Sequence, residues 1–176
     1  MDLLVYPGAN DWRARLPDGT ERPCVIGRGG AVPPSEKREG DGATPLGAWP
    51  VRRVLYRPDR VLAPRSELPV MPLARDLGWC DDPGHTAYNQ AITLPFEAHH
   101  EVMWRADHLY DLVAILGYND DPPVAGMGSA IFLHAAPANG SRTSGCVALD
   151  SAELQTALAQ LGPGSHLRVQ DSPPGF

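Results

Sequence analysis

The most informative segment of the chain runs from Ile131-Phe132-Leu133-His134, through eight mostly small or polar residues, to Thr143-Ser144-Gly145-Cys146-Val147-Ala148-Leu149. The first part, Ser129–Ala135, reads as a buried strand that carries His134 to its end. Because side chains alternate along a strand, we expect two distinct faces, one with Ala130, Phe132 and His134 and the other with Ile131, Leu133 and Ala135.

A histidine at a strand end and a cysteine in the following turn suit nucleophilic chemistry. An imidazole within hydrogen-bond reach removes the thiol proton and leaves a thiolate, which is the reactive form of cysteine. Gly145 allows a tight turn, and the backbone N–H groups of Gly145 and Cys146 suit an oxyanion hole. A lone cysteine among apolar neighbours is also commonly a small buried hydrophobe, so the pair by itself leaves a structural role open.

Around this segment the chain reads as short strands and turns. Proline (19) and glycine (18) are frequent along the whole length, which favours many short strands over long helices. A turn is predicted at 16–19 and a loop at 28–47. Strands are predicted at 3–6, 23–27, 49–56, 69–73, 88–94, 109–118, 129–135 and 166–169.

One helix is predicted near the C-terminus. Asp150-Ser151-Ala152-Glu153 resembles a capping box, and Gly162-Pro163 ends the segment. Between them, apolar residues recur at helical spacing, namely Leu154, Ala157, Leu158 and Leu161. The chain is therefore expected to form a single mainly β domain, residues 1–176, with one C-terminal helix.

Composition excludes several functional classes. The net charge is −6, basic residues form no run longer than a pair, and Lys37 is the only lysine, so we expect no nucleic-acid binding. No segment approaches the roughly 20 apolar residues of a membrane span, and the N-terminus has no signal-peptide pattern. As written, the chain reads as cytoplasmic, or as periplasmic if an export signal was removed.

The cysteines argue against a disulfide framework, because Cys24, Cys80 and Cys146 are odd in number and far apart. We expect Cys24 and Cys80 to be structural. His99-His100-Glu101 is a weak metal motif, since adjacent residues point to opposite sides of a strand. Neither a metal site nor a cofactor is predicted.

Several ordered blocks give the chain a family resemblance over nearly its whole length. The sequence resembles the L,D-transpeptidase catalytic-domain family, which has the YkuD-like fold, in a compact single-domain subgroup. The resemblance implies a mainly β sandwich or barrel with a sheet-lined cleft. The blocks that carry it are Lys37-Arg38-Glu39-Gly40-Asp41-Gly42-Ala43-Thr44-Pro45-Leu46-Gly47, Trp79-Cys80-Asp81-Asp82-Pro83, Tyr88-Asn89, Asp107-His108-Leu109-Tyr110-Asp111, Leu116-Gly117-Tyr118-Asn119, Gly128–His134 and Thr143–Leu149.

The resemblance also implies an activity. A cysteine nucleophile, with a histidine base, attacks the carbonyl of a diamino acid in a peptidoglycan stem tetrapeptide, and the terminal D-alanine leaves. The acyl-enzyme then passes to an amine acceptor or to water. Mapped onto this chain, the nucleophile is Cys146, the base is His134, and the oxyanion turn is Ser144-Gly145-Cys146.

Two positions depart from the family pattern. Many members carry a second histidine where this chain has Ser144, and an arginine where it has Ala148. The missing arginine removes a partner for a substrate carboxylate, and Arg142 is the candidate to replace it. Weaker substrate-binding candidates, for which turn formation or solvated loop charge is the alternative interpretation, are Asp81, Asp82, Tyr88, Asn89 and Lys37.

The expected partner is a peptidoglycan stem peptide or a muropeptide. Because no export signal is seen, L,D-carboxypeptidase action in murein recycling is favoured over L,D-transpeptidation of the wall. Two alternatives stay open. A sortase-like transpeptidase would add Arg168 to the histidine and cysteine, and a muropeptide-binding module would carry an inert cysteine.

Overall fold

The computed structural model describes residues 1–175, which form fourteen strands and one helix. In chain order, these are β1 (Leu3–Pro7), β2 (Trp12–Arg15), β3 (Glu21–Cys24), β4 (Ala31–Val32), β5 (Thr44–Pro45), β6 (Gly47–Tyr56), β7 (Val70–Pro72), β8 (Leu77–Cys80), β9 (Ala91–Thr93), β10 (His100–Val102), β11 (Leu112–Leu116), β12 (Phe132–Ala135), β13 (Val147–Leu149), α1 (Ser151–Ala159) and β14 (His166–Val169). No helix within residues 1–175 is long and apolar enough to cross a membrane.

The main sheet is almost closed into a barrel. Its strands follow the order β13-β12-β11-β6-β14-β1-β2-β3, and β7 pairs with β6 outside this path. The two ends meet where Val25, just after β3, exchanges two backbone hydrogen bonds of 2.9 Å with Ala148 of β13. A second contact joins Gly27 to Thr143. Closure of this kind leaves few unpaired strand edges, and it brings the N-terminal segment against the turn that carries Cys146.

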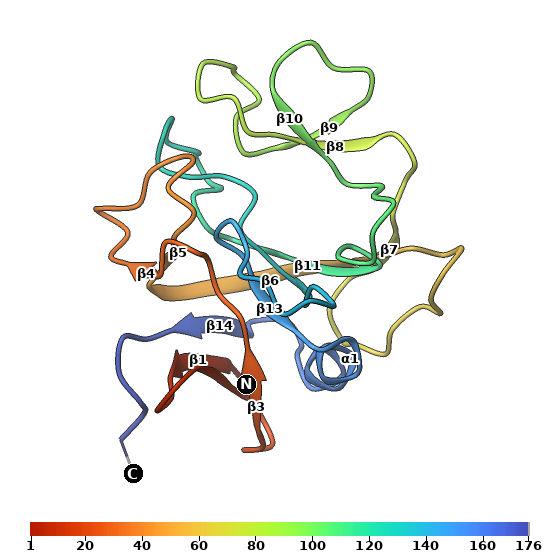
Figure 1. Ribbon diagram of the computed structural model, residues 1–176. Coiled ribbons are helices and arrows are strands. Elements are labelled where there is room, and N and C mark those ends of the chain that lie inside the picture. The colour runs from red at the N-terminus through yellow and green to blue at the C-terminus, as the bar shows by residue number, and fades with distance from the viewer. Residues whose placement is uncertain (176) are drawn as a thin grey trace.

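Two smaller sheets add to the barrel. In Figure 1 the sheet of β10, β8 and β9 lies above the barrel strands, whereas α1 lies at the lower right, below β13 and level with β1. A parallel pair, β4 and β5, lies in the segment that precedes β6. The cavity described below is lined mainly by residues of three segments, 28–42, 101–110 and, between β12 and β13, 136–146.

Strand β12 separates two hydrophobic cores. Leu133 packs in the larger core, together with Leu154 and Leu158 of α1. Phe132 faces the smaller core, where its ring lies edge-on to Trp79 at 5.0 Å. The predicted alternation is therefore confirmed, because the residues on each face of 130–135 pack into different cores.

The C-terminal helix is also confirmed. Asp150 is its N-cap and accepts a hydrogen bond from the Ala152 N–H at 3.0 Å. Glu153 pairs instead with Arg22 at 2.6 Å, so the helix is tied to β3. Leu161 lies beyond the last helical residue but stays buried in the larger core.

Strand predictions succeeded where the apolar pattern was long. The mainly β class is confirmed, as are strands close to 3–6, 49–56, 69–73 and 166–169. The strand predicted at 129–135 is shorter, because β12 begins only at Phe132. The strand predicted at 109–118 is shorter, that at 88–94 covers only β9, and that at 23–27 begins and ends earlier as β3. The 28–47 loop contains β4 and β5, and β2, β8, β10 and β13 were not predicted, because strands of two to four residues are too short to show a clear period.

Replacement of Leu133 by alanine tests the importance of the larger core. Leu133 has no exposed surface, so Leu133→Ala leaves a cavity and lowers the free energy of unfolding by about 3 kcal/mol. Urea denaturation measures this as a lower midpoint with an unchanged slope. The matched control is Leu62→Ala, since Leu62 is 94% exposed and is expected to change stability by less than about 0.5 kcal/mol. Equal effects of the two substitutions would contradict this account of the core.

Candidate active site

A cavity of about 800 Å³ lies between the barrel and the loops that cover it. Cys146 and His134 both line this cavity. Four other predicted site residues line it as well, namely Ser144, Arg142, Asp81 and Lys37. A volume of this size is in the range that accommodates one drug-sized ligand or a short peptide.

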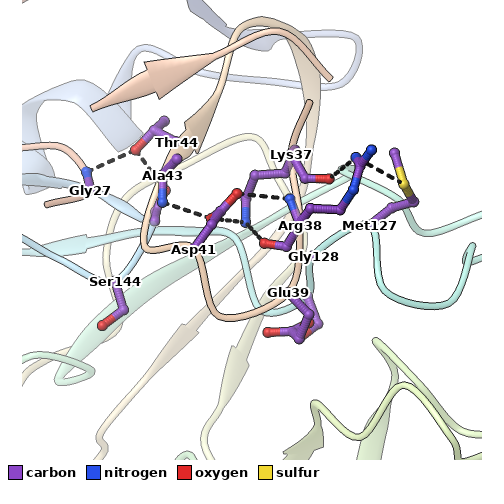
Figure 2. A network of polar contacts seen from close by, with 12 residues as sticks. Gly27, Lys37, Arg38, Glu39, Asp41, Ala43, Thr44, Met127, Gly128 and Ser144 are labelled. Carbon is purple, nitrogen blue, oxygen red and sulfur yellow. Dashed lines mark hydrogen bonds and ion pairs between the residues drawn. The ribbon is translucent and has the colours of Figure 1, made fainter. Parts of the chain in front are cut away.

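Two threonines hold the turn that presents Cys146. The Thr143 hydroxyl donates to the Cys146 carbonyl at 2.5 Å and accepts from the Gly145 N–H at 3.2 Å. The Thr44 hydroxyl donates to the Gly145 carbonyl at 2.8 Å and accepts from the Gly27 N–H, also at 2.8 Å (Figure 2). Thr44 is fully buried, so this hydroxyl joins three separate segments of backbone. The Gly145 N–H is thus already engaged within the turn.

The three segments approach so closely that glycine is required. A Cβ on Gly27 would lie 2.2 Å from the Gly42 carbonyl oxygen and 3.0 Å from the Gly145 Cα. Gly145 itself has a φ of 135°, a conformation that other residues rarely adopt. Backbone is therefore packed directly on backbone beneath the Cys146 turn.

The segment that carries Thr44 is ordered around Asp41. The Asp41 carboxylate accepts from the Lys37 Nζ at 2.7 Å, from the Arg38 N–H at 2.7 Å and from the Ala43 N–H at 2.8 Å. Figure 2 shows Lys37 and Arg38 on one side of this carboxylate and Ala43 on the other. Lys37 is only 2% exposed and also donates to the Arg38 carbonyl. Its positive charge is therefore balanced by Asp41 within the loop.

The Cys146 thiol is buried and neutral. Its Sγ is 3.2 Å from the Ala130 carbonyl oxygen, to which it donates, and it accepts from the Phe132 N–H at 3.3 Å. Burial, together with the nearby Glu101 carboxylate, raises the pKa of Cys146 to about 12. The side chain is 7% exposed and therefore still reaches the cavity surface.

The His134 imidazole is held in its neutral form. Its Nδ1 lies 2.7 Å from the Ala135 carbonyl oxygen. Because a carbonyl only accepts hydrogen bonds, this contact assigns the proton to Nδ1 and leaves the lone pair on Nε2. Burial lowers the pKa of His134 to about 4, and the Tyr110 ring packs edge-on against the imidazole at 5.3 Å.

Thiol and imidazole share the cavity without a direct bond. Within residues 1–175, no hydrogen bond joins the Cys146 Sγ to the His134 ring, since the thiol donates to Ala130 instead. Tyr110 lies close to both groups. Its ring contacts the His134 imidazole, and burial, together with the nearby Cys146, raises the pKa of Tyr110 well above the usual value. Catalytic hydrogen bonds are often loose or absent before substrate binds.

An acidic and aromatic group beside the thiol was missed by the sequence analysis. The Tyr110 hydroxyl donates to the Glu101 carboxylate at 2.5 Å, and burial raises the pKa of Glu101. Arg105 pairs with Asp107 at 2.6 Å and approaches Glu101 to 3.7 Å. Tyr110 belongs to a quoted family block, but Glu101 was weighed only as a metal ligand. Among residues 1–175, no three His, Cys, Asp or Glu side chains are arranged to hold a metal ion.

The weaker sequence candidates fall in different places. Asp81 lines the cavity and pairs with His99 at 2.5 Å. Asp82 lies outside the described cavity lining and accepts from the Gly84 N–H at 2.9 Å, as a turn former does. Tyr88 and Asn89 also lie outside the described lining.

Tyr88 and Asn89 instead support the cavity wall from behind. The Tyr88 hydroxyl donates to Glu39 at 2.5 Å. The Asn89 side-chain oxygen accepts from the Trp79 indole at 2.9 Å and from the Ala130 N–H at 3.0 Å. Asn89 therefore fixes the residue whose carbonyl accepts the hydrogen bond of the Cys146 thiol.

Three arginines could take the place of the arginine that many family members have where this chain has Ala148, and the structure places them differently. Ala148 is fully buried in β13 and leaves no charge there. Arg142 is exposed at the cavity, and Arg28, which the sequence analysis did not select, donates to the Ser144 hydroxyl at 2.6 Å. Arg168 pairs with Asp2 at 2.5 Å and is not among the described residues that line the cavity.

The buried imidazole predicts a pH dependence of stability. In the unfolded chain the pKa of His134 returns to 6.5, so the unfolded state takes up a proton at a higher pH than the folded state. The contribution of His134 is complete above pH 6.5 and is lost as the pH falls toward 4. Between pH 7 and pH 4 the wild type should lose about 3 kcal/mol more than His134→Gln in urea unfolding. Parallel stability curves for the two proteins would rule out a depressed pKa.

Three comparisons with known proteins indicate what the chain is similar to. Residues 9–169 match the family model described as the L,D-transpeptidase catalytic domain, YkuD. A search of curated proteins found no match. Among solved structures, the chain is similar to the helical cell shape determining protein Pgp2 from Campylobacter jejuni, with 16% identity and a TM-score of 0.47. The match covers 98% of this chain and 48% of that one, so this chain spans about half its length. The family model covers most of the sequence, and the chain therefore belongs to the YkuD family of L,D-transpeptidase catalytic domains.

Proposed function

We propose that this protein cleaves the L,D-peptide bond of a peptidoglycan stem tetrapeptide through a thioester on Cys146, with His134 as the base. The observation that carries the proposal is that both side chains line one peptide-sized cavity. Family membership supplies the substrate class, since the family comprises L,D-transpeptidase catalytic domains. Tripeptide and D-alanine are the expected products.

The first half of the reaction forms the thioester. The Cys146 thiol proton passes to the His134 Nε2 as the sulfur bonds to the carbonyl carbon of the diamino acid. The carbonyl oxygen becomes an oxyanion, and we assign the Cys146 N–H as its backbone donor, because the Gly145 N–H is engaged with Thr143. The carbon–nitrogen bond then breaks, and the D-alanine nitrogen takes the proton back from His134.

The tautomer of His134 suits this role. With Nδ1 donating to the Ala135 carbonyl, the lone pair of Nε2 is the one available to accept a proton. The same contact stabilises the imidazolium that forms, because a carbonyl oxygen accepts more strongly from a charged donor. The raised pKa of the thiol and the lowered pKa of the imidazole keep both groups neutral at pH 7. Ionisation is therefore proposed to follow substrate binding, when the thiol leaves the Ala130 carbonyl.

Water is proposed as the favoured acceptor in the second half. It attacks the thioester carbonyl, gives a proton to His134 and releases the tripeptide, while the thiol recovers that proton. A cavity of about 800 Å³ accommodates one stem peptide more readily than two, which supports hydrolysis over exchange with a second peptide. Transfer to an amine is the competing outcome of the same intermediate.

A non-catalytic muropeptide-binding module is the second candidate. The observation in its favour is that the Cys146 thiol is buried, hydrogen-bonded to Ala130 and strongly disfavoured from ionising. In that case the cavity would hold the peptide without cleaving it. The following experiment separates the two candidates.

Incubation with a disaccharide tetrapeptide, followed by mass spectrometry, tests the proposal. The wild type should release D-alanine and leave the tripeptide. Cys146→Ala should form no tripeptide, and His134→Ala should be at least about 100-fold slower while keeping its circular dichroism spectrum. Cys24→Ala is the matched control, because Cys24 is also buried but does not line the cavity, and it should keep full activity.

The products also identify the acceptor. An exchanged or cross-linked product, formed when an amino acid or a second peptide is supplied, would establish transfer in place of hydrolysis. Tripeptide formation by Cys146→Ala at the wild-type rate would overturn the catalytic assignment, and binding without any turnover would favour the second candidate.

A further inference from the structure

The positive charges that line the cavity fall into two groups. Lys37 is paired with Asp41 at 2.7 Å, and Arg105 is paired with Asp107 at 2.6 Å. Arg28 and Arg142 also line the cavity, but neither forms an ion pair with an acidic side chain of residues 1–175. Both flank the Cys146 turn. Arg28 contacts Ser144, and Arg142 precedes Ser144 by two residues in the sequence.

The acidic residues of the cavity are already engaged. Glu39 accepts from Tyr88 and Ser129, and Asp81 contacts His99. Glu101 accepts from Tyr110, and Asp107 accepts from Arg105, as described above. These hydrogen bonds leave carboxylate charge at the cavity, but Arg28 and Arg142, which flank the Cys146 turn, have no acidic partner among residues 1–175, which suits a ligand with an anionic group near the reacting carbonyl.

Arg28 is held in place, unlike Arg142. Its Nη1 donates to the Ser144 hydroxyl at 2.6 Å, and its backbone N–H donates to the Thr143 carbonyl at 2.9 Å as part of the barrel closure. The side chain also lies against Gly42, where a Cβ would come within 3.2 Å of the Arg28 Nε. The guanidinium thus packs against the Gly42 backbone, and it loses little conformational entropy when a ligand binds.

The position of Arg28 matches the geometry of the proposed reaction. Ser144 precedes Cys146 by two residues, so their Cα atoms are no more than about 7.6 Å apart. In the peptide, the carboxylate of the leaving residue is separated from the cleaved bond by only one carbon atom. A guanidinium has five N–H donors, and the bond to Ser144 uses one of them, so others remain for a carboxylate.

We propose that Arg28 binds the α-carboxylate of the residue that leaves, and that this contact makes the protein prefer a free C-terminal carboxylate over its amide. This inference rests on the proposed function, because it takes Cys146 as the reacting group. It gives Arg28 the role of carboxylate partner that the sequence analysis assigned to Arg142. A peptide that is amidated at this carboxylate, or extended by another residue, loses the contact.

Ligand binding to a protein that cannot form a thioester tests this specificity. The Cys146→Ala protein is titrated calorimetrically with Nα-acetyl-L-lysyl-D-alanine and with its C-terminal amide. The free acid should bind about tenfold more tightly than the amide, as expected for a charge-assisted bidentate contact. Adding Arg28→Gln should remove this preference, and Arg28→Lys should keep part of it because the charge remains without the planar fork.

Two other arginines serve as matched controls in the same background. Arg65→Gln removes an exposed charge outside the described cavity lining and should keep the tenfold preference. Arg142→Gln should keep most of it, because no described contact fixes Arg142 against the turn. A preference that survives Arg28→Gln, a preference that is missing in the parent protein, or no binding of either ligand overturns the proposal.

The binding result is independent of turnover. If the tetrapeptide is not cleaved but the free-acid preference depends on Arg28, the proposed function fails and the carboxylate site stands. If the tetrapeptide is cleaved and the preference is unaffected by Arg28→Gln, the proposed function stands and the assignment of Arg28 fails.

Discussion

The closure of the barrel between the end of β3 and β13 is the constraint on which the site depends. The paired hydrogen bonds of Val25 with Ala148 bring the N-terminal segment against the Cys146 turn, and the buried Thr44 hydroxyl then joins Gly27 to Gly145. Because glycine backbone packs on glycine backbone there, the turn has little freedom to move. The same closure carries Arg28 to Ser144, so the proposed nucleophile and the proposed carboxylate site depend on one structural feature.

Burial then sets the chemistry of the resting site. The Cys146 thiol and the His134 imidazole are both kept neutral, because neither charged form is solvated in this environment. The Glu101 carboxylate adds to the cost of a thiolate, whereas the Phe132 N–H lowers it. A thiol of this kind is protected from adventitious oxidation, since reactivity follows the thiolate fraction. In the proposed mechanism, activation therefore depends on a ligand that displaces the thiol from the Ala130 carbonyl.

Local patterns in the sequence predicted part of this structure. The alternation in 129–135 correctly separated the two cores, and the capped repeat at 150–161 correctly located the helix, because both signals depend on neighbouring residues. Contacts between distant segments left no such signal. Arg28 and Ser144 are 116 positions apart, and Thr44 and Gly145 are 101 apart, so neither contact follows from a periodic pattern. Glu101 was weighed only as a metal ligand, because a polar β10 gives no sign of the buried contact with Tyr110. Asn89 was selected as a substrate-binding candidate, whereas its side chain supports Ala130 from behind.

The central claim is that Cys146 reacts with a carbonyl bound in this cavity while His134 faces the reacting atoms. A crystal structure determined after reaction with a carbapenem tests it most directly, because a strained β-lactam acylates an accessible nucleophile irreversibly. The account predicts continuous density from the Cys146 Sγ to the opened ring carbonyl, with the His134 Nε2 directed at the thioester. An unreacted thiol still bonded to the Ala130 carbonyl, or an adduct on another residue, would contradict it.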